Sequence, residues 1–246
     1  MTGKIHIFDP TGNITVLAEC ARDKAVADRV MKEVPTAQQV GFVTDGGKTL
    51  TMTGGEFCGN ASMCAAVLNY EKTGERELML RVSGTDEKTR VLVEKKSGGY
   101  FCTVTMPPVV GTENVILTYG GEEYRVTAVR MQGIIHLIMR VQPEKEKAER
   151  AAKEWCRMLS AEALGLMFLD MSEKIKLTPL VYVPGADTLF WESSCASGTS
   201  AVGVYLREKS GGDIENVEIK EPAGSLFVTA TQDGKMKISG NVRKLR

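Results

Sequence analysis

The 246-residue sequence predicts an α+β protein of two pseudo-symmetric domains. Three observations predict this fold. The order of short apolar runs and helical segments recurs once along the chain. In each half a cysteine stands between a strand and a helix with small residues after it, as FCGNASMCAAV and SCASGTSAVGV. The composition, 43% hydrophobic and 25% charged, is that of a globular protein long enough for two cores.

The first half reads, in order, as a hairpin, a helix, two strands, the cysteine turn with its helix, and two further strands. Short apolar runs predict the strands, apolar residues three and four apart predict the helices, and glycine-marked turns separate them. We expect strands over residues 4–8, 14–18, 39–44, 48–53, 89–95 and 100–106, and helices over 23–34 and after Cys58.

The second half repeats this order. Gln132-Gly133 and Asp233-Gly234 mark hairpin turns, and a charged, alanine-rich segment predicts the first helix. Duplication explains the matched order better than coincidence between two generic strand–helix turns. We expect strands over residues 124–130, 134–141, 166–169, 177–183, 188–191, 218–220, 225–230 and 235–239, and helices over 144–159 and after Cys195.

The two halves divide near Pro107-Pro108. We expect domains over residues 1–111 and 112–246, each with one helix-opening cysteine, and with the last strand free to pack back on the first domain. The active site is expected in the cleft between them, where the two cysteine turns face each other. The basic C-terminal tip, residues 243–246, is expected to be a solvated tail.

Charge and apolar patterning exclude several classes of partner. Lys plus Arg and Asp plus Glu number 31 each, so no basic excess indicates a nucleic-acid partner. No run approaches the roughly 18 apolar residues of a membrane span, and no signal peptide is visible, so we expect a cytoplasmic protein. The six cysteines should then be thiols. Two histidines are too few for a histidine-rich site, so no metal is expected.

Cys58 and Cys195 are the candidate catalytic residues because of where they stand. A helix start carries unpaired N–H groups and a partial positive charge, which should stabilise a thiolate and lower its pKa. The same N–H groups can hold a carboxylate, and small neighbours let a substrate approach the backbone. The other four cysteines lack this setting, and we interpret them as structural: Cys20, Cys64, Cys102 and Cys156.

Two such turns face to face predict a two-base reaction on an amino acid. One sulfur, as thiolate, removes the α-proton, and the other, as thiol, donates a proton to the opposite face, which inverts the configuration. Charge that spreads into the substrate carboxylate meets the fixed N–H dipoles of both helices. No lysine stands in a recognisable setting for pyridoxal phosphate, so no cofactor is expected.

These motifs resemble the diaminopimelate epimerase superfamily, which includes proline racemases and the histidine racemases of opine-metallophore biosynthesis. The resemblance spans nearly the whole chain and is closest to the histidine racemase branch, in GGEFCGNASM and FWESSCASGTSAVGV. It implies two similar domains, each a curved, mostly antiparallel sheet around a central helix. It also implies catalysis without pyridoxal phosphate or metal. The two active cysteines of the family fall on Cys58 and Cys195.

The resemblance further implies residues that bind the substrate. Asparagine and glutamine side chains lie near the substrate in the family, and the amides after each cysteine bind its carboxylate. Glu192 could bind the substrate ammonium or, equally, stabilise the helix start through its charge. The implied set is Asn13, Gln39, Gly59, Asn60, Glu192, Ala196 and Ser197.

Departures from the family pattern bear on the substrate. The diaminopimelate epimerases carry Gly-Asn-Pro-His where this chain has residues 133–136 as Gly-Ile-Ile-His, and they carry an arginine beside the glutamate matched by Glu192. Without that arginine a second carboxylate would be poorly held. Proline racemases have histidine at the position of Asn60. The overall resemblance to the histidine racemase branch implies histidine as the substrate, although Gln39 stands where histidine racemases place a glutamate.

Two other functions stay open at this stage. The chain could be an isomerase of the same fold for another amino acid or small unsaturated acid, or a non-catalytic relative that binds an amino acid. Retention of both cysteines favours the racemase. Trp191 could wall the substrate pocket or belong to the core. The only partner expected is the small-molecule amino acid, and a homodimer is left open.

The facing cysteines make a redox prediction. Two thiols across an empty cleft can oxidise to a Cys58–Cys195 disulfide, which removes both acid–base groups. We expect racemisation to be lost on oxidation and restored by a reducing agent, as measured by the rate before and after dithiothreitol. Full activity after exhaustive oxidation would contradict the mechanism.

Overall fold

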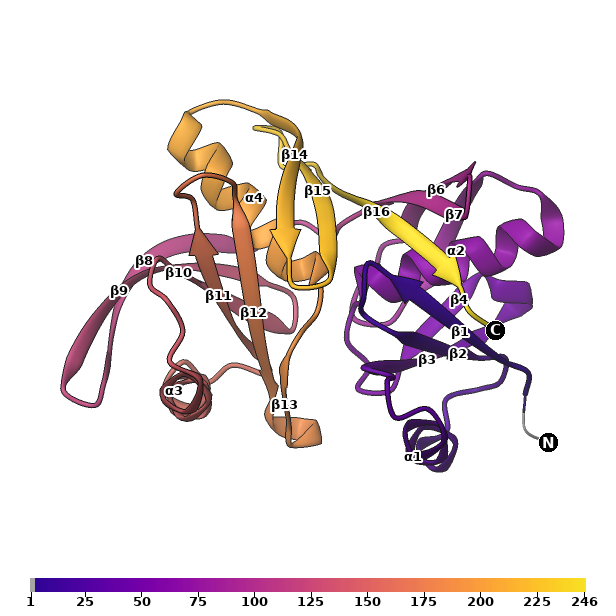
Figure 1. Ribbon diagram of the computed structural model, residues 1–246, viewed down its shortest axis with the longest axis horizontal. Helices are drawn as coiled ribbons and strands as arrows, with labels where there is room; N and C mark the ends of the chain where they lie inside the picture. The colour runs from indigo at the N-terminus through magenta and orange to yellow at the C-terminus, as the bar shows by residue number, and fades with distance from the viewer. Residues whose placement is uncertain (1–2) are drawn as a thin grey trace.

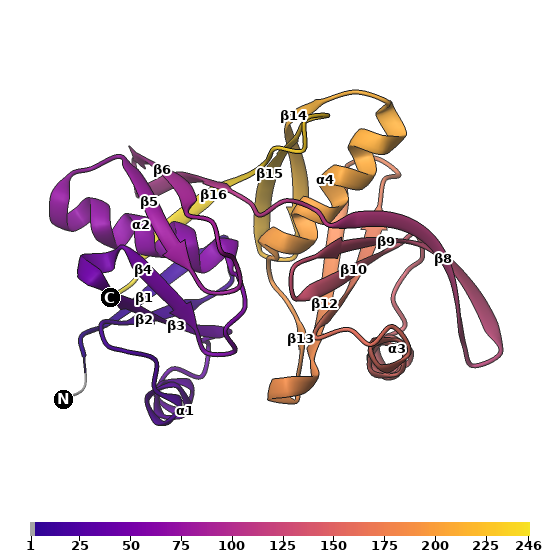
Figure 2. The same cartoon turned by 180° about the vertical axis from the view of Figure 1, so that it is seen from behind.

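The computed structural model describes residues 3–246 and has the predicted α+β fold. Figures 1 and 2 show two lobes, each with a helix inside a curve of strands. The strands of both lobes form one continuous sheet that is joined through β16 (Met236–Lys244), and the first and second sheet are its parts in the two lobes. The last strand runs from the second lobe into the first, where the C-terminus lies near the N-terminus.

The first lobe contains all of its predicted elements in the predicted order, and one further strand, β5. Each strand alternates or runs continuously in buried residues, and each helix begins and ends at a capped position. Its elements are β1 (Ile5–Pro10), β2 (Thr15–Ala18), α1 (Lys24–Glu33), β3 (Gln39–Thr44), the 3-10 turn η1 (Asp45–Gly47), β4 (Thr49–Met52), α2 (Gly59–Thr73), β5 (Glu77–Val82), β6 (Thr89–Lys96) and β7 (Gly99–Thr105).

The strands of the first lobe close into a ring around α2. Strands β1 to β7 neighbour one another in chain order, and β16 (Met236–Lys244) pairs with both β7 and β1. Every residue from 59 to 69 of α2 is buried, because strands cover the helix on all sides. Helix α1 covers the outside of the ring with Ala27 and Val30.

The second lobe repeats these elements and adds one strand before them and one short strand before its cysteine turn. Its elements are β8 (Gly111–Tyr119), β9 (Glu122–Met131), β10 (Ile134–Met139), α3 (Lys145–Met158), β11 (Leu164–Asp170), β12 (Lys176–Val183), the 3-10 turn η2 (Pro184–Ala186), β13 (Thr188–Trp191), α4 (Ala196–Ser210), β14 (Ile214–Glu221) and β15 (Gly224–Ala230).

The strand pairings of the two lobes match, which confirms the predicted pseudo-symmetry. Where a helix intervenes, the flanking strands are parallel: β2 with β3 and β4 with β5 in the first lobe, and β10 with β11 and β12 with β14 in the second. The neighbouring hairpins are antiparallel. The second sheet stays open at β8, and the β8–β9 hairpin projects from the lobe in Figure 1.

Helices α3 and α4 lie on opposite faces of the second sheet. Alternate residues of β10 and β11 separate into two cores, so that Ile138 and Met167 pack with α4 while Leu137 and Leu166 pack with α3. Trp155 of α3 is fully buried. The face that α4 occupies is continuous with the first lobe, because Ile138 and Met167 share one hydrophobic cluster with the residues around α2.

Three sequence expectations need correction. Strand β5 was not predicted, although Leu78, Leu80 and Val82 alternate with exposed residues in the typical two-residue period. Strand β8 was not predicted either, because an edge strand with one buried residue carries little pattern. The basic tip is no solvated tail: β16 continues to Lys244, and the tip forms ion pairs of Arg243 with Asp9 and of Lys244 with Glu71.

The position of β16 between the lobes predicts a large effect of Ile238. This side chain is fully buried, and its residue pairs with Val104 of the first lobe and Val228 of the second. We expect Ile238→Ala to lower the free energy of unfolding by about 2–5 kcal/mol, measured by urea denaturation. Ile116→Ala, at a β8 position that is 55% exposed, is the control and should stay within about 0.5 kcal/mol.

Candidate active site

Both predicted catalytic cysteines are the N-cap residue of the central helix of their lobe. Their backbones are nearly identical, with φ −133° and ψ 111° at Cys58 and φ −135° and ψ 103° at Cys195. The Cys58 sulfur accepts the amide of Ala61 at 3.4 Å, and the Cys195 sulfur accepts that of Gly198 at 3.3 Å. The sequence therefore builds the same local geometry twice.

The two helix starts meet at Gly59 and Ala196, the first residues of α2 and α4. A Cβ atom added to Gly59 would lie 2.8 Å from the Cβ of Ala196 and 3.1 Å from the sulfur of Met106, so no larger side chain fits. The amides of the first helical residues have no partner within their own helix. Gly59 and Asn60 of one helix thus come beside Ala196 and Ser197 of the other.

Asn13 and Asn60 hold the two lobes together through one buried carbonyl. The amide nitrogens of both side chains donate to the main-chain oxygen of Ser194, at 2.8 Å and 3.2 Å. Both side chains are at least 97% buried, yet neither amide oxygen has a hydrogen-bond partner in the described part of the chain. Two acceptors therefore stand unused beside the cysteines.

A second contact between the lobes lies next to the first and was not predicted. Gln38 donates to the hydroxyl of Ser193 at 2.8 Å, and the amide of Ser193 donates back to the Gln38 carbonyl at 3.5 Å. Gln38 precedes Gln39, and Ser193 precedes Ser194. Single polar residues of this kind have no sequence signal, because their pairing exists only once the lobes meet.

The side chain of Gln39 contacts the first cysteine. Its carbonyl accepts the thiol of Cys58 at 3.0 Å, and its nitrogen donates to the Thr15 hydroxyl at 2.7 Å. Strand β3 places it there because β3 lies parallel to β2 with Gln39 opposite Thr15. In this arrangement Gln39 orients the Cys58 thiol.

The expected lowering of the thiol pKa is not found in this closed arrangement. Burial raises the pKa of Cys58 to about 12, against the lowering effect of the Ala61 amide, and the charges of Glu56 and Glu192 raise it further. Burial likewise raises the pKa of Cys195 well above its ordinary value, and Glu192 and Glu221 add to the rise. Loss of solvent outweighs the helix N-terminus here, because an anion loses more hydration than one N–H group replaces.

Two carboxyl groups lie next to Cys195. Glu192 is partly buried, and loss of solvent raises its pKa to about 7. Glu221, which the sequence interpretation missed, ends β14; burial raises its pKa to about 8. It accepts the Cys195 amide at 2.6 Å and the Thr199 hydroxyl. Ser197 lies 3.5 Å, hydroxyl to sulfur, from Cys195.

Trp191, which the sequence left open between pocket and core, and His136 both belong to the packing of the second lobe. Trp191 stacks on Phe168 and donates its ring N–H to Glu149 at 2.8 Å, so it belongs to the packing around α3. His136 is fully buried in β10 with both ring nitrogens unpartnered within residues 3–246, and burial lowers its pKa to about 3. It is therefore a neutral imidazole.

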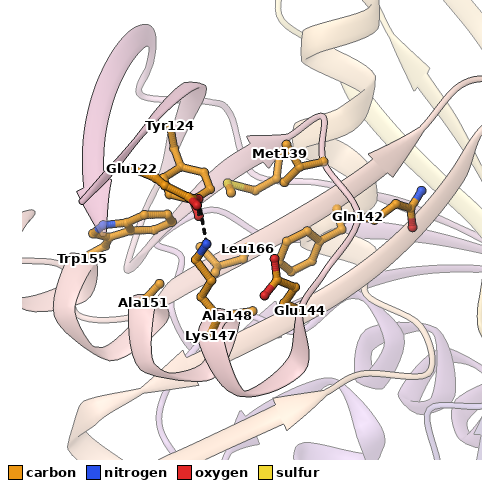
Figure 3. Close-up of a pocket in the computed structure, with 12 residues that line it drawn as sticks. Glu122, Tyr124, Met139, Gln142, Glu144, Lys147, Ala148, Ala151, Trp155 and Leu166 are labelled. Atoms are coloured by element: carbon orange, nitrogen blue, oxygen red, sulfur yellow. Dashed lines mark hydrogen bonds and ion pairs between the residues drawn. The ribbon is translucent and has the colours of Figure 1, made fainter. Parts of the chain in front are cut away.

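A pocket of about 190 Å³ lies elsewhere, under α3 on the face of the second sheet opposite α4. Figure 3 shows Lys147 directed at Glu122 across its mouth, with the rings of Tyr124 and Trp155 beside it. Lys147 pairs with Glu122 at 2.7 Å, and Tyr124 also donates to that carboxylate. Neither cysteine lines this pocket, and three of its polar residues, Glu122, Tyr124 and Lys147, bind one another, so it is not the candidate site.

Residues 3–246 contain neither a cluster of three or more potential metal ligands nor a helix long and apolar enough to cross a membrane.

Sequence comparison places this geometry in a family. The model described as the histidine racemase CntK N-terminal domain matches residues 5–244. The chain belongs to this family. A histidine racemase of Fusobacterium nucleatum (strain ATCC 23726) is 31% identical, over 98% of this chain and 96% of that protein. A histidine racemase of Staphylococcus aureus (strain Mu50) is 24% identical, over 91% and 86%.

Structural comparison agrees with the fold. A probable proline racemase from Agrobacterium radiobacter K84 superposes with a TM-score of 0.69 at 13% identity, covering 97% of this chain and 90% of that one. At that identity the likeness shows the fold alone. Family membership makes the protein an isomerase of the amino-acid racemase type, as the two cysteine turns predict.

The buried carboxyl groups predict a stability that falls as the pH rises. Below about pH 4 Glu221 is protonated in both the folded and the unfolded chain, so its ionisation does not change the free energy of unfolding. Between about pH 4.5 and 8 the Glu221 carboxyl group loses its proton in the unfolded chain but keeps it in the folded chain. The free energy of unfolding therefore declines as the pH rises through this interval.

Glu221→Gln should remove part of this decline, as measured by urea denaturation at pH 5 and pH 8. Glu218→Gln, at an exposed position of the same strand, is the control and should decline in parallel with the parent. A Glu221→Gln variant that loses as much stability over this interval as the parent would refute the assignment.

Proposed function

We propose that this protein interconverts L- and D-histidine without a cofactor, with Cys58 and Cys195 as its two acid–base groups. The observation that carries the proposal is the meeting of two helix starts, each with a cysteine as N-cap and unpaired amides beyond it. Such a pair is complementary to an α-amino acid, whose α-carbon can lie between two sulfurs while its carboxylate meets both sets of amides.

The polar groups around the cysteines support an orientation for the substrate. Its carboxylate would accept from the amides of Gly59 and Asn60 and of Ala196 and Ser197. Its ammonium would donate to Glu192 and to the unused amide oxygens of Asn13 and Asn60, because buried acceptors without donors are costly. Since Cys195 is only 5% exposed, the lobes must part to admit the substrate.

The reaction is a transfer of one proton out and one proton in. The thiolate of one cysteine takes the α-proton and becomes a thiol, while the C–H electron pair moves into the substrate carboxylate. The thiol of the other cysteine gives its proton to the opposite face of the α-carbon and becomes a thiolate. The product leaves with inverted configuration, and the two cysteines have exchanged protonation states.

In the proposed reaction the substrate itself favours the thiolate. The charges of Glu56 and Glu192 raise the pKa of Cys58 in the closed protein. An ammonium group that pairs with Glu192 cancels part of that effect and favours the thiolate. Deprotonation of the α-carbon therefore follows closure over a substrate, and water is kept from the carbanion-like transition state.

Histidine as the substrate rests on family membership and on the absence of a second carboxylate site. The carboxyl groups of Glu56, Glu192 and Glu221 lie around the cysteines. Among the described residues, Arg22 is the one cation that lowers the pKa of any of these three groups, and it acts on Glu56. A negatively charged substrate side chain would be repelled there, whereas an imidazole or imidazolium would be accepted.

The decisive experiment is incubation of the purified, reduced protein with L-histidine in D₂O. We expect deuterium at the α-carbon and loss of optical rotation, because the donating thiol exchanges with solvent. Cys58→Ser and Cys195→Ser should each lower the racemisation rate by at least roughly a hundredfold, since a serine hydroxyl is a far weaker acid.

Cys20→Ser is the matched control, because Cys20 is a partly exposed free thiol outside the site, and its rate should equal that of the parent. Absence of α-deuterium with every common amino acid would refute racemisation. Turnover of another amino acid but not of histidine would refute the substrate alone.

A further inference from the structure

Glu221 is a buried carboxylate whose hydrogen bonds all concern the start of α4. It is 7% exposed, and its two oxygens accept the amide of Cys195 at 2.6 Å and the hydroxyl of Thr199. These donors lie one helical turn apart, so one carboxylate spans the first turn of the helix. No cation of the described residues is among the groups that shift its pKa.

A buried carboxylate without a cation is costly, and a neutral side chain could accept the same two bonds. In the first lobe β5 is the counterpart of β14, because β5 runs parallel to β4 as β14 runs parallel to β12. Arg81 pairs with Thr49 as Lys220 pairs with Lys176, so Val82, which has no carboxylate, takes the position of Glu221. The residue after β5 is Ser83, whose hydroxyl donates to the carbonyl of Glu56 and accepts the amide of Met52.

The two halves therefore hold their cysteine turns differently. Ser83 holds the loop two residues before Cys58 and does not contact that residue, whereas Glu221 binds the main chain of Cys195 itself. The charge of Glu221 also acts on the Cys195 thiol, together with that of Glu192, while Glu56 and Glu192 act on Cys58. The two halves therefore differ in the contacts made directly to the proposed acid–base residue Cys195.

The turn that follows Glu221 rests on the first lobe. A Cβ atom added to Gly12 would lie 2.0 Å from the Cβ of Ala223, and one added to Gly224 would lie 2.8 Å from the methyl group of Thr11. The amide of Ala223 donates to Ser193 at 3.2 Å. The turn of residues 222–224 thus contacts the Gly12 turn, which precedes Asn13. It directly follows Glu221, whose carboxyl group binds Cys195.

We propose that Glu221 is a positioning residue for the proposed racemisation: its carboxyl group fixes the Cys195 turn when the 222–224 turn seats on Gly12. Where that carboxyl group is ionised, its charge also favours the protonated Cys195 thiol. The inference rests on the proposed function for its kinetic consequence. Closure of the lobes and alignment of the second sulfur become one event, because the same turn takes part in both.

Two substitutions separate position from charge. Glu221→Gln keeps an acceptor for the Cys195 amide, and its nitrogen can donate to Thr199, but the charge is gone. Its kcat should stay within a few-fold of the parent, while the pH midpoint for iodoacetamide labelling of Cys195 falls by about one unit and that of Cys58 stays unchanged. Glu221→Ala removes both roles, and kcat should fall roughly a hundredfold with KM nearly unchanged.

Glu218→Gln is again the control, with neither labelling profile nor kcat altered. Thr199→Val removes one of the two donors to Glu221, and it tests the positioning role even if Glu221→Ala does not fold. It should lower kcat about tenfold and leave the pH profile of Cys58 labelling unchanged. An unchanged Cys195 labelling profile in Glu221→Gln overturns the proposal, as does a parental kcat in Thr199→Val. Labelling needs no turnover, so a parent that racemises nothing refutes the proposed function and still leaves Glu221 tested.

Discussion

The structure depends on the contact of two helix N-termini, Gly59 of α2 against Ala196 of α4. Helix starts repel each other electrostatically and leave amides unpaired, so their burial together needs an explanation beyond packing. Each cysteine sulfur occupies one amide of its helix, and Asn13 and Asn60 bind the carbonyl of Ser194 across the contact. The amides left over are those that an amino-acid carboxylate would need.

The strands of each lobe hold one of these helix starts in place, but the two lobes differ in how their strands close. The first closes into a ring through β16, whereas the second stays open at β8 and receives its last strand from the same segment. The proposed inversion would use two similar acid–base groups, which duplication supplies. Glu221 makes the two cysteine turns differ, because it binds the main chain of Cys195 whereas Ser83 binds the carbonyl of Glu56.

Electrostatics in this site follow burial more than the helix dipole. A helix start alone favours a thiolate, yet Cys58 and the carboxyl groups of Glu192 and Glu221 all have raised pKa values because solvent is excluded. In the closed arrangement burial therefore favours the protonated thiols. In the proposed reaction the ammonium group of a substrate would shift that balance toward the thiolate.

The sequence alone determined the fold class, the duplication and the two cysteine turns, because these are local: strand periodicity, glycine caps and the small residues after Cys58 and Cys195 leave a pattern in the order of residues. It missed β8, an edge strand with one buried residue, and it misjudged the tip of β16. Only the tertiary structure decided the rest. Gln39 turns to Cys58, Ser193 meets Gln38, Glu221 clamps Cys195, and the thiol pKa rises instead of falling. Each of these depends on residues far apart in the chain and on how much solvent their meeting excludes, which no local pattern records.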